Sequence, residues 1–276
     1  MITYPTCKIN LGLHVVGKRP DGYHDLQSVF YPVPLCDELE ITPADVFSFS
    51  ASGIVVDGDA EDNIVVKAFR LMQRETDGRI GYVAIRLHKN IPFGAGLGGG
   101  SSDAAFALRM LNDIFGLGMD SGLLRSLAAR LGADCSFFID NQPAYVTGIG
   151  DRLEPLGFDP LKGYTLVLVK PDEAVSTAEA YRGVVPRESL GLPCPEVSLL
   201  LKQPVGKWRD AVVNDFESSV FKSHPLLSKL KERLYSAGAL YASMSGSGST
   251  IYGIFENGFN VNINRELNCN VYSFNL

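Results

Sequence analysis

Glycines and hydroxyls concentrate in residues 92–103, which read Pro-Phe-Gly-Ala-Gly-Leu-Gly-Gly-Gly-Ser-Ser-Asp. An apolar run typical of a strand precedes them at 82–87, and a run with helical spacing follows at 104–112. Glycine lets backbone N–H groups converge, and the start of a helix adds unpaired donors and a positive dipole. The stretch therefore predicts an anion site for a polyphosphate, with Ser101 to Asp103 capping the helix.

Two familiar glycine motifs fit this stretch incompletely. Gly94, Gly96 and Gly99 match G-x-G-x-x-G, but a dinucleotide-binding unit needs a strand after the helix, and a second helix is expected here. A P-loop needs a lysine where Gly100 stands. A flexible linker is disfavoured, because linkers rarely join a buried strand to an apolar helix.

Near the N-terminus, residues 6–15 alternate in the manner of a strand, with one apolar face. Lys8, Asn10, Gly12 and His14 share the other face, so Lys8 and Asn10 lie about 6–7 Å apart along the strand. Such a pair can hold an anion and orient a hydroxyl group. The alternative is an ordinary solvated strand face.

Asp134 stands between Gly132 and the apolar run 137–139, where partial burial is expected. A buried carboxylate needs a partner to stay ionised. Lys8 is a candidate partner, and an ionised Asp134 could accept a proton. The alternative is a helix-capping or turn aspartate.

Two turns carry residues that could recognise a ligand. Residues 17–24 contain two cations and end in Tyr23 and His24, where tyrosine can stack on a flat ring and histidine can hydrogen-bond to its edge. Residues 245–250 read Ser-Gly-Ser-Gly-Ser-Thr and could add donors to a phosphate site. The alternatives are a solvated turn for the first and a plain hairpin turn for the second.

The composition limits the class of protein. The chain has 276 residues, 46% of them hydrophobic, and a net charge of −6, which argues against general nucleic-acid binding. No apolar run approaches the roughly 20 residues that span a bilayer, and the N-terminus resembles no targeting peptide. The five cysteines are scattered without C-x-x-C, so we expect reduced thiols, a cytoplasmic location and no structural metal.

The pattern along the chain predicts an α+β protein, with a Pro/Gly-bearing linker near 155–160 that would divide it into domains 1–156 and 157–276. Expected strands cover 7–16, 37–42, 46–56, 82–87, 164–169, 240–244, 250–255 and 270–274. Expected helices cover 63–73, 104–112, 120–131, 208–221 and 225–236.

Together these segments resemble the GHMP kinase superfamily. Three motifs occur in the family's order: Lys8-Ile-Asn-Leu, then the glycine stretch from Pro92, then Met244-Ser-Gly-Ser-Gly-Ser-Thr. Within the superfamily, the turn at 17–24 and Leu131-Gly-Ala-Asp are similar to kinases that act on a cytidine-diphosphate sugar alcohol. The likeness spans most of residues 5–256.

The resemblance implies a two-domain GHMP kinase fold, with an N-terminal domain like ribosomal protein S5 domain 2 and a ferredoxin-like C-terminal domain. It implies ATP-dependent phosphorylation of a small-molecule hydroxyl in the non-mevalonate route to isoprenoids, by a monomer or weak homodimer. Asp134 would be the general base and Lys8 its partner. Mg²⁺ is implied as well, but its ligands are not assignable from the sequence.

The resemblance also implies two sets of binding residues. The acceptor would be bound by Asn10, Tyr23, His24, Thr177 and Tyr181. The ATP phosphates would be held by Pro92, Phe93, Gly94, Ala95, Gly96, Leu97, Gly98, Gly99, Gly100, Ser101, Ser102, Ser245, Gly246 and Ser247.

Three other functions remain open on the sequence. Another kinase of the superfamily would act on mevalonate or homoserine, although a small aliphatic acid needs no stacking tyrosine such as Tyr23. A non-catalytic regulator would keep the fold and lose the chemistry, which the presence of Lys8 and Asp134 disfavours. A nicotinamide-dependent oxidoreductase is the most distant alternative.

Overall fold

The computed structural model describes residues 1–55, 58–259 and 269–276. Val56, the last residue of one expected strand, and residues 260–268 of the Asn-rich segment 257–270 lie outside these ranges. The described residues form two compact units: unit 1 contains 1–8, 32–93 and 98–142, and unit 2 contains 9–31, 94–97 and 143–276. The expected division at 156/157 stays a prediction.

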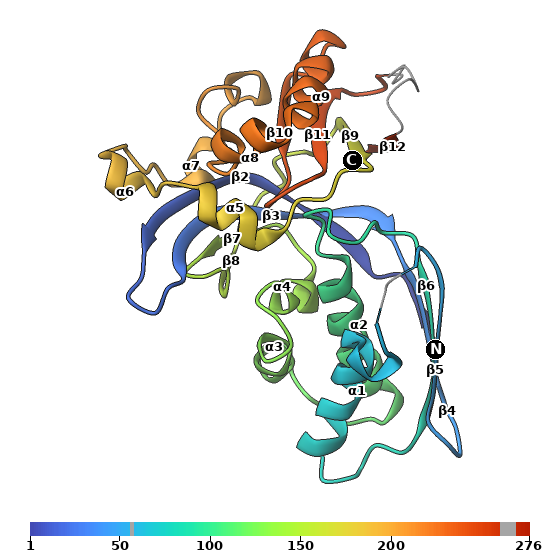
Figure 1. The fold of residues 1–276 in the computed structure, drawn as a ribbon. Coiled ribbons are helices and arrows are strands. Elements are labelled where there is room, and N and C mark those ends of the chain that lie inside the picture. Colours follow the sequence, from blue (N-terminus) through green and yellow to red (C-terminus); the bar gives the residue numbers. More distant parts are fainter. Residues whose placement is uncertain (56–57, 260–268) are drawn as a thin grey trace. The chain divides into compact units, whose positions relative to one another are not determined.

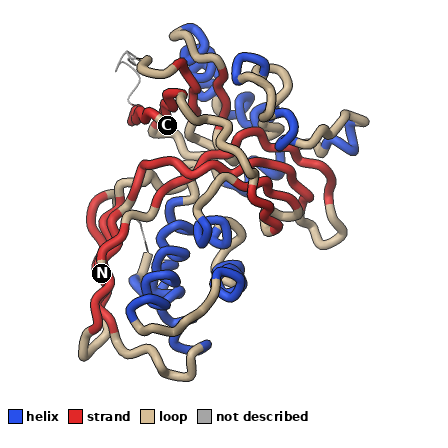
Figure 2. The backbone as a smooth tube through the Cα atoms, turned by 180° about the vertical axis from the view of Figure 1, so that it is seen from behind, coloured by secondary structure: helices blue, strands red, loops and turns tan. Residues whose placement is uncertain are grey.

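Unit 1 is a mixed sheet with helices on one face (Figures 1 and 2). In β6 the apolar residues Val83, Ile85 and Leu87 are buried on one face, whereas Arg86 and His88 point outward and the terminal Lys89 is buried. The sheet order is β1 (Ile2–Thr3), β4 (Glu38–Pro43), β6 (Val83–Lys89), β5 (Ser48–Gly53). The helices are η1 (Ala60–Asp62), α1 (Ile64–Glu75), α2 (Gly99–Ile114), α3 (Ser121–Ala129) and α4 (Cys135–Asp140).

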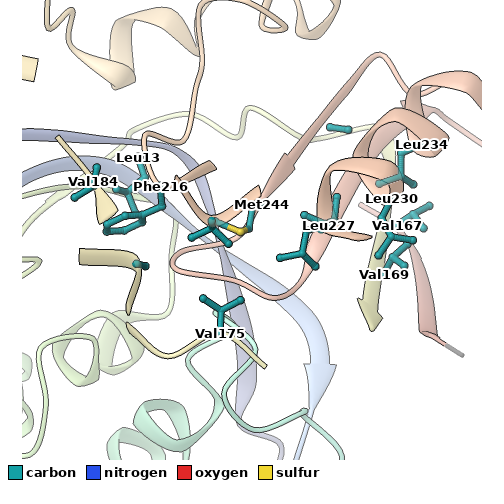
Figure 3. Close-up of a cluster of buried hydrophobic side chains, with 14 of the residues drawn as sticks. Leu13, Val167, Val169, Val175, Val184, Phe216, Leu227, Leu230, Leu234 and Met244 are labelled. Atoms are coloured by element: carbon teal, nitrogen blue, oxygen red, sulfur yellow. The ribbon is translucent and has the colours of Figure 1, made fainter. Parts of the chain in front are cut away.

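Unit 2 contains an antiparallel sheet ordered β10 (Tyr241–Met244), β11 (Ile251–Glu256), β9 (Tyr164–Pro171), β12 (Cys269–Asn275). Helix α9 (Pro225–Ser236) packs on β10 and β11 and buries Leu227, Leu230 and Leu234 in the core drawn in Figure 3. The other helices are α5 (Thr177–Gly183), α6 (Arg187–Leu190), α7 (Val197–Leu200), η2 (Val205–Lys207) and α8 (Glu217–Ser223).

A third sheet is ordered β2 (Thr6–Lys18), β3 (His24–Cys36), β7 (Ala144–Thr147), β8 (Arg152–Pro155). Its long strands β2 and β3 contribute residues to both units, the first changing unit after Lys8 and the second after Tyr31. For this reason no single boundary in the sequence separates the two compact units.

The mixture of sheets and helices confirms the α+β class, but the helix expected at 208–221 is wrong over residues 208–216. Only α8 is helical within the expected range. The backbone at 213–215 instead pairs with β2, because Leu13 N–H donates to Val213 O at 2.9 Å and Asp215 N–H donates to Leu13 O at 2.9 Å. These tertiary hydrogen bonds outweigh the local helical pattern.

The polar face expected for β2 is not solvated. Lys8 is 4% exposed, Asn10 2% and His14 0%. The strand is therefore covered on both faces, and the simple reading of Lys8 and Asn10 as a solvated strand face is wrong. Buried polar groups of this kind need partners or a function.

His14 makes the stability of unit 2 dependent on pH. Burial lowers the pKa of His14 from 6.5 to about 4, and the charge of Arg187 lowers it further than Asp215 raises it. The neutral ring of His14 contributes its full stabilisation at pH values above the pKa that this histidine has in the unfolded chain. The contribution is lost as the pH falls toward 4. Between pH 7 and 5 we expect the unfolding free energy to fall by on the order of 2 kcal/mol through this group.

Urea denaturation of the unaltered chain, His14→Gln and His88→Gln at both pH values measures this contribution. The pH effect should shrink in His14→Gln and persist in His88→Gln, because His88 is exposed. An equal pH effect in all three proteins would contradict the assignment to His14.

Candidate active site

The glycine stretch ends at the start of α2 in unit 1. Gly98 occupies the N-cap position with φ 69°, and α2 begins at Gly99. A Cβ at Gly98 would lie 3.1 Å from Phe138 Cζ and 3.2 Å from Lys8 Cε. Glycine is needed here both for the left-handed backbone and for the close passage of the Lys8 side chain.

The expectation that Ser101 to Asp103 cap α2 is wrong. The helix starts at Gly99, five residues before the expected 104, so these residues lie inside it, and the N-cap Gly98 makes no side-chain hydrogen bond. Ser102 Oγ is buried and has no hydrogen-bond partner in the described part of the chain. An unsatisfied hydroxyl in the first turn, where N–H groups are also unpaired, fits a phosphate ligand.

Lys8 and Asp134 form the ion pair that the sequence suggested. Lys8 Nζ lies 3.3 Å from Asp134 Oδ2, and the two side chains are 5% and 32% exposed. Asp134 does occupy the N-cap position of α4, but its side chain makes no capping hydrogen bond. The carboxylate is thus held by Lys8, and its remaining exposure leaves it accessible to a ligand.

Residues 94–97 and the serine–glycine turn contact one another in unit 2. Ser245 Oγ donates to Gly96 O at 2.8 Å, and Thr250 N–H donates to Ala95 O at 3.2 Å. A Cβ at Gly96 would lie 2.1 Å from Ser245 O, so only glycine fits. The turn does join β10 to β11 as a hairpin, and it also supports the glycine stretch.

Asn10 is fixed in the same unit by three hydrogen bonds. Its Nδ2 donates to Ser28 Oγ at 2.9 Å, its backbone N–H donates to Ser245 Oγ at 3.3 Å, and its carbonyl accepts from Tyr252 Oη at 2.8 Å. A Cβ at Gly246 would come within 3.3 Å of Asn10 Oδ1. Asn10 is therefore held in one orientation beside the turn.

The residues expected to bind the acceptor also lie in unit 2. The rings of His24 and Tyr181 stack with centroids 5.2 Å apart, and Thr177 Oγ1 lies 3.2 Å from Ser247 Oγ. Tyr23 is 61% exposed. Burial, followed by the charge of Lys18, lowers the pKa of His24, which favours a neutral ring with one donor and one acceptor.

Arg19 behaves as the solvated-turn alternative predicts. Its guanidinium pairs with Asp21 at 3.1 Å and with Asp25 at 3.4 Å, on a half-exposed surface.

No protein-only metal site occurs in the described ranges, where no three His, Cys, Asp or Glu side chains gather suitably. Asp103, the other carboxylate near the glycine stretch, is 2% exposed and bound to Lys89. Within these same ranges, no helix is long and apolar enough to cross a membrane. Cys7, Cys36, Cys135 and Cys194 are free thiols.

Sequence reasoning missed two anchoring groups. Asn214 Nδ2 donates to Met244 O and Gly246 O, both at 2.8 Å, and so fixes the serine–glycine turn. Lys89 joins Asp37 and Asp103 in a buried cluster. Lys89 stands at the end of an alternating strand and could be expected inside it, but nothing local identifies its partners.

Comparison with known proteins agrees with these features. Residues 63–148 match the GHMP kinases N terminal domain, and residues 197–266 match the GHMP kinases C terminal family. A 4-diphosphocytidyl-2-C-methyl-D-erythritol kinase of Parabacteroides distasonis is 50% identical over 93% of this chain and 92% of its own length. One of Bacteroides thetaiotaomicron is 48% identical over 93% and 92%.

A solved structure of a 4-(cytidine 5'-diphospho)-2C-methyl-D-erythritol kinase superposes with a TM-score of 0.80 at 33% identity, covering 93% of this chain and 91% of that one. The resemblance inferred from the three motifs is thereby confirmed. The chain is a kinase that belongs to the GHMP kinase family.

Proposed function

We propose that this kinase transfers the γ-phosphoryl group of ATP to the 2-hydroxyl of 4-diphosphocytidyl-2-C-methyl-D-erythritol. The observation that carries the proposal is the Lys8–Asp134 pair at 3.3 Å, with Lys8 passing against Gly98 at the start of α2. A proton acceptor, a cation and a phosphate-binding helix start are the groups that phosphoryl transfer to an alcohol requires. The identity of the substrate is inferred from the names of the related kinases.

In this proposal Asp134 accepts the proton of the attacking hydroxyl as the new P–O bond forms and the bond to ADP breaks. The buried ammonium of Lys8 pairs with the carboxylate before the reaction and offsets negative charge at the attacking oxygen. The partial exposure of Asp134 gives the hydroxyl access to it.

The glycine stretch and the first turn of α2 bind the ATP phosphates through backbone N–H groups and the hydroxyls of Ser101 and Ser102. The unsatisfied Ser102 Oγ supports this assignment. Mg²⁺ would enter with the phosphates and neutralise their charge, since this ion retains most of its oxygen ligands from substrate and water. We assign it no protein ligand.

The acceptor is recognised in unit 2 by its cytosine ring. His24 and Tyr181 already form a stacked aromatic pair, and a neutral His24 can both donate to and accept from the base edge. Asn10 and Thr177 supply hydrogen-bonding groups for the sugar alcohol. Remote binding of this kind aligns the hydroxyl for reaction. We place the enzyme in the cytoplasm, as a monomer or weak homodimer.

Tyr23 should contribute to acceptor binding through stacking. Because one aromatic–base stack is worth about 1–3 kcal/mol, we expect Tyr23→Ala to raise the KM for the cytidyl substrate about 10- to 100-fold. The KM for ATP should stay within about threefold, since the loss is confined to the acceptor. Tyr4→Ala removes an equally exposed tyrosine of unit 1 and serves as the control. An unchanged KM in Tyr23→Ala would exclude the stacking role.

A parallel turnover assay tests the function itself. The protein is incubated with Mg-ATP and separately with the cytidyl compound, mevalonate and homoserine, and ADP release is measured. We expect turnover with the cytidyl compound alone. Turnover with mevalonate or homoserine would favour another GHMP kinase activity, and ATP binding without turnover on any acceptor would favour a regulator. Nicotinamide cofactor binding would favour the oxidoreductase alternative.

A further inference from the structure

A buried ion cluster in unit 1 consists of Lys89, Asp37 and Asp103. Lys89 Nζ bonds to Asp37 Oδ2 and lies 2.6 Å from Asp103 Oδ2. The three side chains are 5%, 0% and 2% exposed, so water does not satisfy their charges. None of these residues has a part in the reaction described above.

The cluster holds both ends of the glycine stretch. Asp37 Oδ1 accepts hydrogen bonds from the backbone N–H groups of Asn90 at 2.6 Å and Ile91 at 2.8 Å, immediately before Pro92. Asp103 follows the first turn of α2, immediately after Ser102. One ammonium therefore links the entry of the stretch to its exit.

The charge balance of the cluster argues against stability as its main role. Two carboxylates and one ammonium carry a formal charge of −1 in the interior. Burial raises the pKa of Asp103, and the charge of Asp37 adds to this. Burial alone would lower the pKa of Lys89, but the two carboxylates outweigh it and raise that pKa. Apolar side chains of similar volume commonly stabilise a protein as well as such a cluster does.

We propose that Lys89 is a positioning residue for nucleotide binding: with Asp37 and Asp103 it fixes both ends of the glycine stretch and so preorganises its phosphate-binding N–H groups. The proposal rests on the function proposed above. Preorganised donors need no reordering when the phosphates arrive, so loss of the link weakens nucleotide binding. Binding of the cytidyl acceptor does not depend on it.

The test uses two variants of the full-length protein. Lys89→Met removes the link and leaves two buried carboxylates, so we expect loss of stability together with weaker nucleotide binding. Lys89→Met/Asp103→Leu also removes the link, but it keeps the formal charge of −1 and the hydrogen bonds from Asn90 and Ile91 to Asp37. The double variant therefore separates positioning from stability.

Calorimetry with Mg²⁺ and a non-hydrolysable ATP analogue, without acceptor, measures the Kd, and thermal unfolding measures the Tm. In the double variant we expect the Tm to recover toward that of the unaltered protein while the Kd stays at least about tenfold higher. Recovery of both Tm and nucleotide affinity would overturn the proposal. If the double variant fails to fold, Asp103→Asn provides the test. We expect its Kd to be raised at least about threefold. An unchanged Kd would overturn the proposal.

Leu111→Ala is the matched control, because Leu111 is buried in the same helix but outside the cluster. It should lower the Tm and leave the Kd unchanged; a Kd raised as much as in the double variant would mean that nucleotide affinity simply follows stability. If the unaltered protein binds no nucleotide, this proposal and the proposed function both fail. If it binds the nucleotide but does not phosphorylate the cytidyl compound, only the proposed substrate fails.

Discussion

Asp134→Asn is expected to lower kcat about 10²- to 10⁴-fold, the range that general-base catalysis supplies. Asparagine has nearly the same shape but cannot take the proton of the attacking hydroxyl. Lys8 then faces a neutral amide in place of the carboxylate 3.3 Å away. The change lies in the reacting group and not in the phosphate-binding backbone, so nucleotide affinity should remain within about threefold.

Steady-state kinetics and calorimetric ATP binding test this expectation together. Asp140→Asn is the control, since Asp140 ends the same helix α4 and pairs at the surface with Arg125. It should retain full activity. Full activity in Asp134→Asn would remove Asp134 from the mechanism, whereas loss of ATP binding would point to a structural role.

Gly96→Ala is expected to weaken ATP binding about 100-fold or more, because the new Cβ would lie 2.1 Å from the carbonyl oxygen of Ser245. That oxygen belongs to the backbone, so the glycine stretch or the serine–glycine turn must move. Gly96 also has a φ of 74°, which alanine adopts at a cost of about 1–2 kcal/mol. Both effects act on the segment that would hold the phosphates.

Gly94→Ala separates the two effects. Gly94 has a φ of 60°, but a Cβ there would meet nothing within 4 Å. We therefore expect only the backbone cost, with ATP binding weakened about tenfold or less. Calorimetric Kd values for both variants decide the matter. Equal losses would show that backbone strain alone, and not the contact with Ser245, controls the segment.

Much of the secondary structure followed from the sequence because its signals are local. The alternation of β2, the helical spacing of α1 after Asn63, and the glycines before α2 each reflect the conformation of neighbouring residues. Asn63 does cap α1, through a hydrogen bond from Val65 N–H to its side chain. The same local reasoning failed at 208–216, where hydrogen bonds to β2 decide the backbone.

The candidate site divides in the same way. Lys8 and Asp134 were paired from their chemistry and from the expected burial of Asp134, and the ion pair bears this out. The Lys89 cluster could not be predicted, because Asp37 and Asp103 are distant in sequence and each alone reads as an ordinary surface acid. The start of α2 was placed too late, because a glycine N-cap with positive φ leaves no side-chain capping signal.

A double-mutant cycle on single-turnover phosphoryl transfer tests most directly whether Lys8 and Asp134 act as one unit. Rapid-quench rates are measured with saturating Mg-ATP and 4-diphosphocytidyl-2-C-methyl-D-erythritol for the unaltered chain, Lys8→Met, Asp134→Asn and the double variant. We expect the double variant to be slower than Asp134→Asn by no more than about threefold, since either change already disables the pair. Losses that multiply fully in the double variant would contradict this expectation.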